Sequence, residues 1–103
     1  MYQQRVRQQV LYGQFREYTK IAEEVIALRR KLGLAPATLW APTFGTANEV
    51  VWQIEYPDLA TFQRENEAFH SDADLMKQWR RLWQHAVQGS TRDELLEEAP
   101  HIA

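Results

Sequence analysis

His70 is the side chain of this 103-residue sequence best suited to acid–base chemistry. Imidazole is the one side chain that ordinarily gains and loses a proton near neutral pH. The other two histidines are less suitable, because His85 falls on the polar side of an expected helix and His101 lies in the tail. No two of the three have the helical spacing of a zinc-binding motif, and the chain has no cysteine. We therefore expect neither a metal site nor a thiolate nucleophile.

A break in an expected helix places His70 beside freed backbone groups. Apolar spacing predicts a helix that begins after the N-cap residue Asp58 and falters at His70. Ser71 and Asp74 then have the spacing of a capping box, which starts a new helix. Such a break suits a general acid or base. The simpler interpretation is that His70 only caps a helix end at the surface.

The elements that must position His70 follow the order strand, helix, strand, strand, helix. Alternating apolar residues predict strands, and apolar residues spaced three and four apart predict helices. The expected strands cover residues 5–12, 37–44 and 49–56, and the expected helices cover 15–32, 59–69 and 75–87. Arg29, Arg30 and Lys31 stand in the last turn of the first helix, where they complement its dipole.

The tail decides the fold class. Helix-forming residues dominate from Thr91 to Ala99, yet local propensity leaves open whether this segment is a helix or a strand. If it is a strand, the chain is an α+β protein with ferredoxin-like βαββαβ order, in which two helices cover one face of a four-stranded antiparallel sheet. We expect a single domain over residues 1–103, because a chain of this size supports one core.

The sheet face away from the helices indicates a partner. In the expected register it carries Arg5, Arg7, Gln9, Leu11, Thr38, Trp40, Phe44, Val51, Gln53 and Glu55. This set is too apolar for a solvated surface and too polar for a core, which predicts a homodimer packed sheet to sheet. The expected interface residues are Arg7, Trp40, Phe44, Gln53 and Glu55. Arg7 and Glu55 are expected to pair across neighbouring strands.

Charge and hydropathy exclude several other partners. The net charge of −2 provides no basic surface for nucleic acid. No apolar run is long enough to span a bilayer, and the first residues do not form a secretory signal. We therefore expect a cytoplasmic protein that binds neither nucleic acid nor membranes.

Several short motifs follow one another in a consistent order between Val6 and Ala99. They are Gly13 at the first strand-to-helix turn, Trp40, Gly45, Asn48, the run from Val50 to Tyr56, the step Asp58-Leu59-Ala60, the step Asp72-Ala73-Asp74, and Trp79. In this order and spacing the chain resembles the NIPSNAP family of the dimeric α+β barrel superfamily. The resemblance implies the ferredoxin-like fold, a dimer, and a fourth strand in the tail.

The same resemblance implies a ligand pocket between the sheet and the second helix. In the expected register, the helix-facing side of the sheet carries Gln8, Tyr12, Trp52 and Tyr56, and the helix break places His70 over them. We predict that His70 acts as the base or acid. The other four residues are predicted to bind a small aromatic or acyl/polyketide-like molecule, because Tyr and Trp can stack on a planar group while donating a hydrogen bond.

Two functions remain open at this stage. The superfamily is understood to include cofactor-independent monooxygenases, polyketide cyclases and haem-degrading enzymes. The haem-degrading members use an Asn on the first strand where this chain has Gln8 and Gln9, so we expect no cofactor and a monooxygenase or cyclase. The alternative is a non-catalytic structural or interaction dimer with a filled core. A cavity bounded by Tyr12, Trp52 and His70 favours a ligand, and helix aromatics filling that volume favour the structural dimer.

Overall fold

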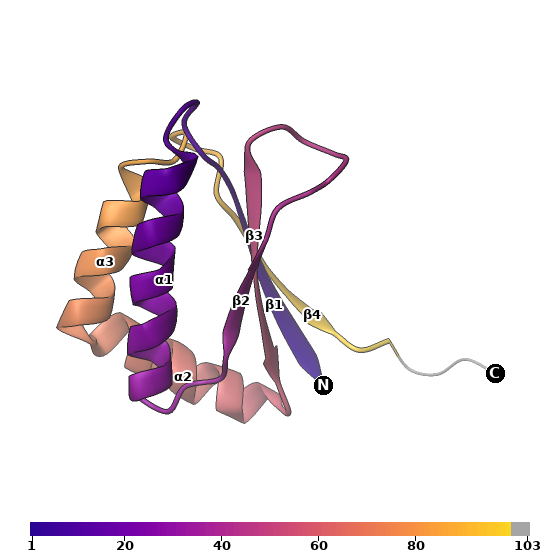
Figure 1. Cartoon of the computed structure of the whole chain (residues 1–103). Helices are drawn as coiled ribbons and strands as arrows, with labels where there is room; N and C mark the ends of the chain where they lie inside the picture. The colour runs from indigo at the N-terminus through magenta and orange to yellow at the C-terminus, as the bar shows by residue number, and fades with distance from the viewer. Residues whose placement is uncertain (100–103) are drawn as a thin grey trace.

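In residues 1–99, the part of the chain that the structure describes, three helices cover one face of a four-stranded antiparallel sheet (Figure 1). The structure is a computed structural model. The elements are β1 (Tyr2–Gln9), α1 (Phe15–Lys31), β2 (Ala37–Trp40), β3 (Glu49–Tyr56), α2 (Leu59–Ser71), α3 (Ala73–Trp83) and β4 (Arg92–Glu97). The strand order is β2-β3-β1-β4. This confirms the expected α+β, ferredoxin-like βαββαβ fold, which is the subunit fold of a dimeric α+β barrel. His101 lies outside the described residues.

The central strand β1 begins and ends earlier in the chain than expected. It runs from Tyr2 to Gln9. Beyond Gln9 the chain leaves these strand pairings, since Val10 forms an isolated bridge with Ala86 and the N–H of Leu11 donates to the carbonyl of His85 (2.8 Å). Tyr12, expected at the end of this strand, therefore lies in the following turn and is 91% exposed.

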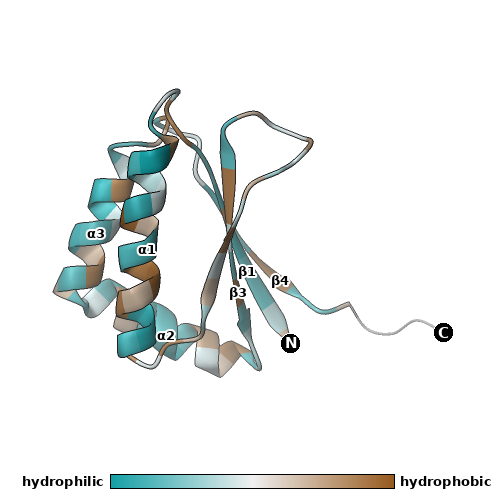
Figure 2. Cartoon of the chain, viewed as in Figure 1, coloured by the Kyte–Doolittle hydropathy of each residue, from teal (hydrophilic) through white to brown (hydrophobic). Residues whose placement is uncertain are grey.

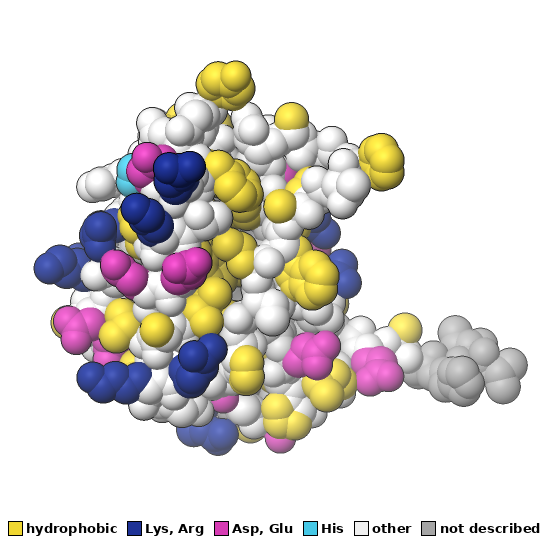
Figure 3. Space-filling view, viewed as in Figure 1, with side chains coloured by type: hydrophobic (Ala, Val, Ile, Leu, Met, Phe, Trp, Pro, Cys, Tyr) yellow, Lys and Arg dark blue, Asp and Glu magenta, His cyan; other side chains and the backbone are white. Residues whose placement is uncertain are grey.

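The strand β2 is shorter than the expected segment 37–44 and ends at Trp40. Pro42 explains the early end, because proline has no N–H to donate to a strand ladder. Phe44, expected on the sheet face, instead lies in the loop between β2 and β3 and is 93% exposed. Figure 3 shows hydrophobic side chains projecting from the molecule at this end.

The core lies between the helix layer and the sheet. On α1, the side chains of Tyr18, Ala22 and Val25 are fully buried, at the helical spacing expected for an inward face. Figure 2 shows the alternation of hydrophobic and hydrophilic segments along α1 and α3. On α3 the two buried side chains are Leu75 and Leu82. No helix in residues 1–99 is long and apolar enough to cross a membrane.

A single residue, Asp72, separates α2 from α3. Its side chain accepts a hydrogen bond from the N–H of Leu75 (2.9 Å) and caps α3. Ser71, expected to be the cap, instead ends α2, and its hydroxyl donates to the carbonyl of Glu67 (2.8 Å). The break therefore falls at Asp72, two residues after His70, which stands in the last turn of α2.

The tail forms the strand β4 and so resolves the alternative that local propensity left open. It pairs antiparallel with β1, with Leu95 opposite Gln4 and Asp93 opposite Val6. Leu95 also packs against the core. Tertiary pairing and this packing therefore override the helical preference of the segment.

Within residues 1–99, no helix lies on the other face of the sheet (Figure 1). Trp40 lies on β2 and is 57% exposed. The expected pairing of Arg7 with Glu55 is wrong, because the register places Arg7 opposite Val51 and Glu55 opposite Gln3. Arg7 instead forms an ion pair with Glu49 (3.3 Å).

Candidate functional site

A cavity of about 70 Å³ lies between the sheet and α2, near the end of that helix. Its lining residues are Gln4, Val6, Arg29, Trp52, Ile54, Tyr56, Asn66, Phe69, His70, Trp79 and Asp93. Three of the expected site residues, Trp52, Tyr56 and His70, are thus brought together here. Gln8 and Tyr12 do not line the cavity.

Gln8 belongs to a buried hydrogen-bond chain beside the cavity. The indole N–H of Trp52 donates to the hydroxyl of Tyr18 (2.8 Å), which donates to Oε1 of Gln8 (2.5 Å). Nε2 of Gln8 then donates to the hydroxyl of Thr91 (3.0 Å). Burial raises the pKa of Tyr18 far above its ordinary value, so its hydroxyl stays protonated. We refer to these four residues as the Tyr18 chain; it fixes the ring of Trp52 in the cavity wall.

Among residues 1–99, one ring nitrogen of His70 has no hydrogen-bond partner. Its Nδ1 lies 2.7 Å from the backbone carbonyl of Asn66, one turn earlier in α2. A carbonyl can only accept, so Nδ1 carries the proton and, in the neutral ring, Nε2 carries the lone pair. The side chain is exposed at the cavity rim, and its ring contacts the edge of Phe69 (5.4 Å between centroids). In the neutral ring, Nε2 is therefore the nitrogen that can accept a proton.

Aromatic side chains form the apolar wall. Trp79 contacts Trp52 edge to face (centroids 5.6 Å apart) and contacts Phe69 in the same way (5.6 Å). Phe62 packs edge to face on Tyr56 (5.3 Å), at the end of β3. Rings in these orientations are fixed by one another and offer a flat apolar surface to a ligand.

The polar side of the wall includes a second hydrogen-bonded group on the sheet. The hydroxyl of Tyr56 donates to Oε1 of Gln4 (3.2 Å), and Nε2 of Gln4 donates to Asp93 (3.0 Å). Burial raises the pKa of Tyr56, and the positive charge of Arg29 opposes this effect. The Asp93 carboxylate thus lies at the cavity as a hydrogen-bonded anion.

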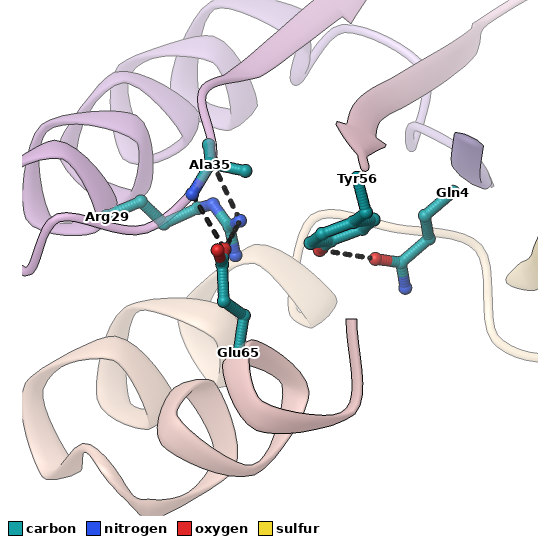
Figure 4. A network of polar contacts seen from close by, with 5 residues as sticks. All are labelled: Gln4, Arg29, Ala35, Tyr56 and Glu65. Carbon is teal, nitrogen blue, oxygen red and sulfur yellow. Dashed lines mark hydrogen bonds and ion pairs between the residues drawn. The ribbon is translucent and has the colours of Figure 1, made fainter. Parts of the chain in front are cut away.

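Arg29 is a site residue that the sequence analysis did not identify. It is 4% exposed, and its Nη2 donates to the carbonyl of Ala35 (3.0 Å) (Figure 4). Glu65 Oε1 lies 3.9 Å from Nη2 and accepts from the N–H of Ala35 (2.7 Å). The signal was its spacing, since Arg29 continues the buried stripe of α1 at positions 18, 22 and 25.

The arrangement combines a proton acceptor, hydrogen-bond donors and a flat apolar wall around one small volume. His70 supplies the acceptor, and Arg29 supplies a positive charge. In residues 1–99 no group of three or more His, Asp or Glu side chains is placed to hold a metal ion. The chemistry that these residues can perform themselves is binding and proton transfer.

Comparisons with known proteins agree with this fold. A sequence model of the NIPSNAP family matches residues 9–97. A NIPSNAP domain protein from Burkholderia xenovorans has a TM-score of 0.79 at 19% identity, over 100% of this chain and 99% of that chain. A comparison with curated protein sequences found no match.

Two enzymes share the fold at low sequence identity. An antibiotic biosynthesis monooxygenase has a TM-score of 0.76 at 13% identity, over 97% of this chain and 100% of that chain. SnoaB, a cofactor-independent oxygenase from Streptomyces nogalater, has a TM-score of 0.67 at 16% identity, over 98% of this chain and 95% of that chain. At these identities the similarity concerns the fold and does not extend to the reaction.

Proposed function

Because the chain belongs to the NIPSNAP family, we propose that it binds a small aromatic or acyl/polyketide-like molecule in the cavity between the sheet and α2. The observation that carries the proposal is the cavity itself, in which aromatic rings and polar side chains converge on one volume. Trp52 and Tyr56 contact the ligand, and His70 lies at the open rim.

The size of the cavity limits the part of the ligand that is enclosed. A volume of about 70 Å³ corresponds to roughly five water molecules. A short acyl group or the edge of one ring fits within it. The rest of a larger ligand passes His70 into solvent.

The chemistry that we propose is proton transfer at Nε2 of His70 in a cofactor-independent monooxygenase or cyclase. If a bound compound is converted, His70→Ala is expected to lower the rate by about 10²–10⁴-fold, the usual contribution of a general base. His85→Ala is the matched control, because His85 hydrogen-bonds to Gln14 and does not line the cavity. An unchanged rate in His70→Ala would contradict a role as base.

Binding is tested at the rim, where a substitution leaves the core intact. Asn66 is exposed and lines the cavity, whereas its exposed neighbour Glu67 does not. Single-ring aromatic and short acyl compounds, acids together with their amides, are titrated by two-dimensional NMR. Asn66→Phe is expected to weaken binding by about tenfold or more because the added ring fills the opening, and Glu67→Phe to leave it unchanged. The proposal fails if no compound binds, or if both variants bind as the wild type does.

We also propose that the chain is a homodimer that packs through the uncovered sheet face. Trp40 is half exposed on that face, with Arg7, Gln53 and Glu55 on the neighbouring strands. Phe44 would join the interface from its loop. Trp40→Glu is expected to give a monomer by light scattering, whereas Leu32→Glu, at the exposed end of α1, should stay dimeric. A wild-type chain that is monomeric at high concentration contradicts the proposal.

A structural or interaction dimer without a ligand is the second candidate. The observation that favours it is the packing of Phe69 and Trp79, whose edge-to-face contact takes up part of the space between the sheet and α2. The titration separates the candidates, because a dimer of this kind would bind none of the compounds.

A further inference from the structure

Arg29 carries a charge in a place where a charge is costly. Among residues 1–99 it is the one charged side chain that is buried. A guanidinium does not lose its proton in proteins, so its charge has to be compensated where it lies. The compensation that the fold provides can be counted group by group.

The protein's own groups compensate Arg29 only in part. Nη2 donates to the carbonyl of Ala35 (3.0 Å). The one nearby carboxylate oxygen, Oε1 of Glu65, lies 3.9 Å from Nη2, beyond hydrogen-bond distance, and accepts instead from the N–H of Ala35. The buried Nε–H has no hydrogen-bond partner in residues 1–99. A buried donor of this kind costs free energy unless another acceptor reaches it.

The residue that carries this unpartnered group lines the cavity. Arg29 lines it from α1, and its Cζ lies 5.7 Å from the centre of the Phe69 ring. Figure 4 shows Arg29 and Tyr56 pointing toward one another, while the Tyr56 hydroxyl donates to Gln4. The planar guanidinium is the side chain whose geometry best matches a carboxylate.

We propose that the ligand of this cavity is a small monocarboxylic acid whose carboxylate pairs with the guanidinium of Arg29. The inference rests on the proposed function, that the cavity binds a small molecule, and names the class of that molecule. The apolar part of the acid lies against Phe69 and Trp79, and the volume of about 70 Å³ encloses a short acyl chain.

A second charge on the cavity wall sets the selectivity. Asp93, a solvent-exposed residue of β4, lines the same cavity, and its carboxylate is held by Gln4. It repels a second anionic group on the ligand. The site therefore selects a monocarboxylate over a dicarboxylate of equal length. Non-specific electrostatic binding of anions to a positive surface would instead favour the dicarboxylate.

The test compares matched probes on the full chain by calorimetry. Butyrate is compared with butyramide and with succinate, in the wild type, in Arg29→Gln and in Arg30→Gln, which changes the exposed neighbour on the same helix. We expect wild type and Arg30→Gln to bind butyrate about tenfold tighter than butyramide, since a charge-assisted hydrogen bond is about twice as strong as a neutral one. Arg29→Gln should bind the two equally.

The outcomes separate this inference from the function on which it rests. Equal binding of butyrate and butyramide by the wild type, or a preference that survives in Arg29→Gln, overturns the carboxylate assignment and leaves the cavity as a binding site. Binding of neither compound, nor of any other compound in the titration, overturns both. If Arg29→Gln fails to fold, the wild-type comparison decides: succinate bound as tightly as butyrate overturns the inference, and weaker binding of succinate supports it.

Discussion

Two buried polar clusters lie between the sheet and the helices, and they differ in whether their hydrogen bonds are complete. In the Tyr18 chain, each side chain from Trp52 to Thr91 has a partner within the chain. In the cluster around Arg29, a buried N–H has no partner among the described residues and the guanidinium lines a cavity. A network in which every buried polar group has a partner rigidifies a core. A cluster with an unpartnered group beside a cavity is suited to an incoming ligand, and we refer to the Arg29 cluster as the open cluster for this reason.

The largest effect on stability is expected in the Tyr18 chain. Tyr18→Phe leaves the indole N–H of Trp52 and Oε1 of Gln8 buried without their partner. We expect the free energy of unfolding to fall by about 2–4 kcal/mol, as for two unsatisfied buried groups, measured by urea denaturation. Tyr12→Phe is the matched control and should change nothing measurable, because Tyr12 is exposed. If Tyr18→Phe lowers the free energy of unfolding only slightly, the hydrogen bonds of the Tyr18 chain do not stabilise the fold.

Alkaline pH is expected to weaken the same chain to a smaller degree. Burial raises the pKa of Tyr18 above its ordinary value of 10.0. A group with a raised folded-state pKa stabilises fully below its unfolded pKa, and this contribution is lost as pH rises. The contribution of Tyr18 to the free energy of unfolding should therefore be constant up to about pH 10 and then fall by up to about 1.4 kcal/mol per pH unit, which lowers the urea midpoint. Tyr18→Phe should reduce the fall of the urea midpoint above pH 10. A wild-type midpoint that is unchanged at pH 11 would contradict the raised pKa of Tyr18.

The smallest loss of stability is expected at the open cluster. Arg29→Met removes the bond to Ala35 but also removes the cost of burying a charge, and Met fills a similar volume. We expect the free energy of unfolding to change by about 1 kcal/mol or less, while the preference for butyrate over butyramide disappears. A loss as large as that of Tyr18→Phe would make Arg29 a structural residue and remove the contrast between the clusters.

Most of the fold could be predicted from periodicity. The first helix begins at Phe15 and β3 runs from Glu49 to Tyr56, as the apolar spacing indicates. The tail could not be predicted locally, because its residues favour a helix and only pairing with β1 makes it a strand. The early end of β1, which moves Tyr12 into a turn, accompanies long-range contacts of Val10 with Ala86 and of Leu11 with His85.

The candidate site was predictable where a residue follows a regular pattern. Trp52 and Tyr56 follow from the alternation of β3, and His70 follows from the helix break. Gln4 and Asp93 reach the cavity only through the pairing of β1 with β4. Burial of Gln8 was predictable, but its bond to Tyr18 joins two elements and leaves no sequence pattern.

The difference between the Tyr18 chain and the Arg29 cluster is tested most directly by following side-chain NMR signals of both clusters during one titration. Butyrate is added to the isotope-labelled chain while the Nε–H signal of Arg29 and the amide signal of Gln8 are followed. We predict that the Nε–H signal of Arg29 shifts and saturates, because its guanidinium gains an anionic partner, and that the Gln8 signal stays in place. An Arg29 signal that does not respond to butyrate while the Trp79 signal shifts would contradict the assignment of the open cluster as the carboxylate site.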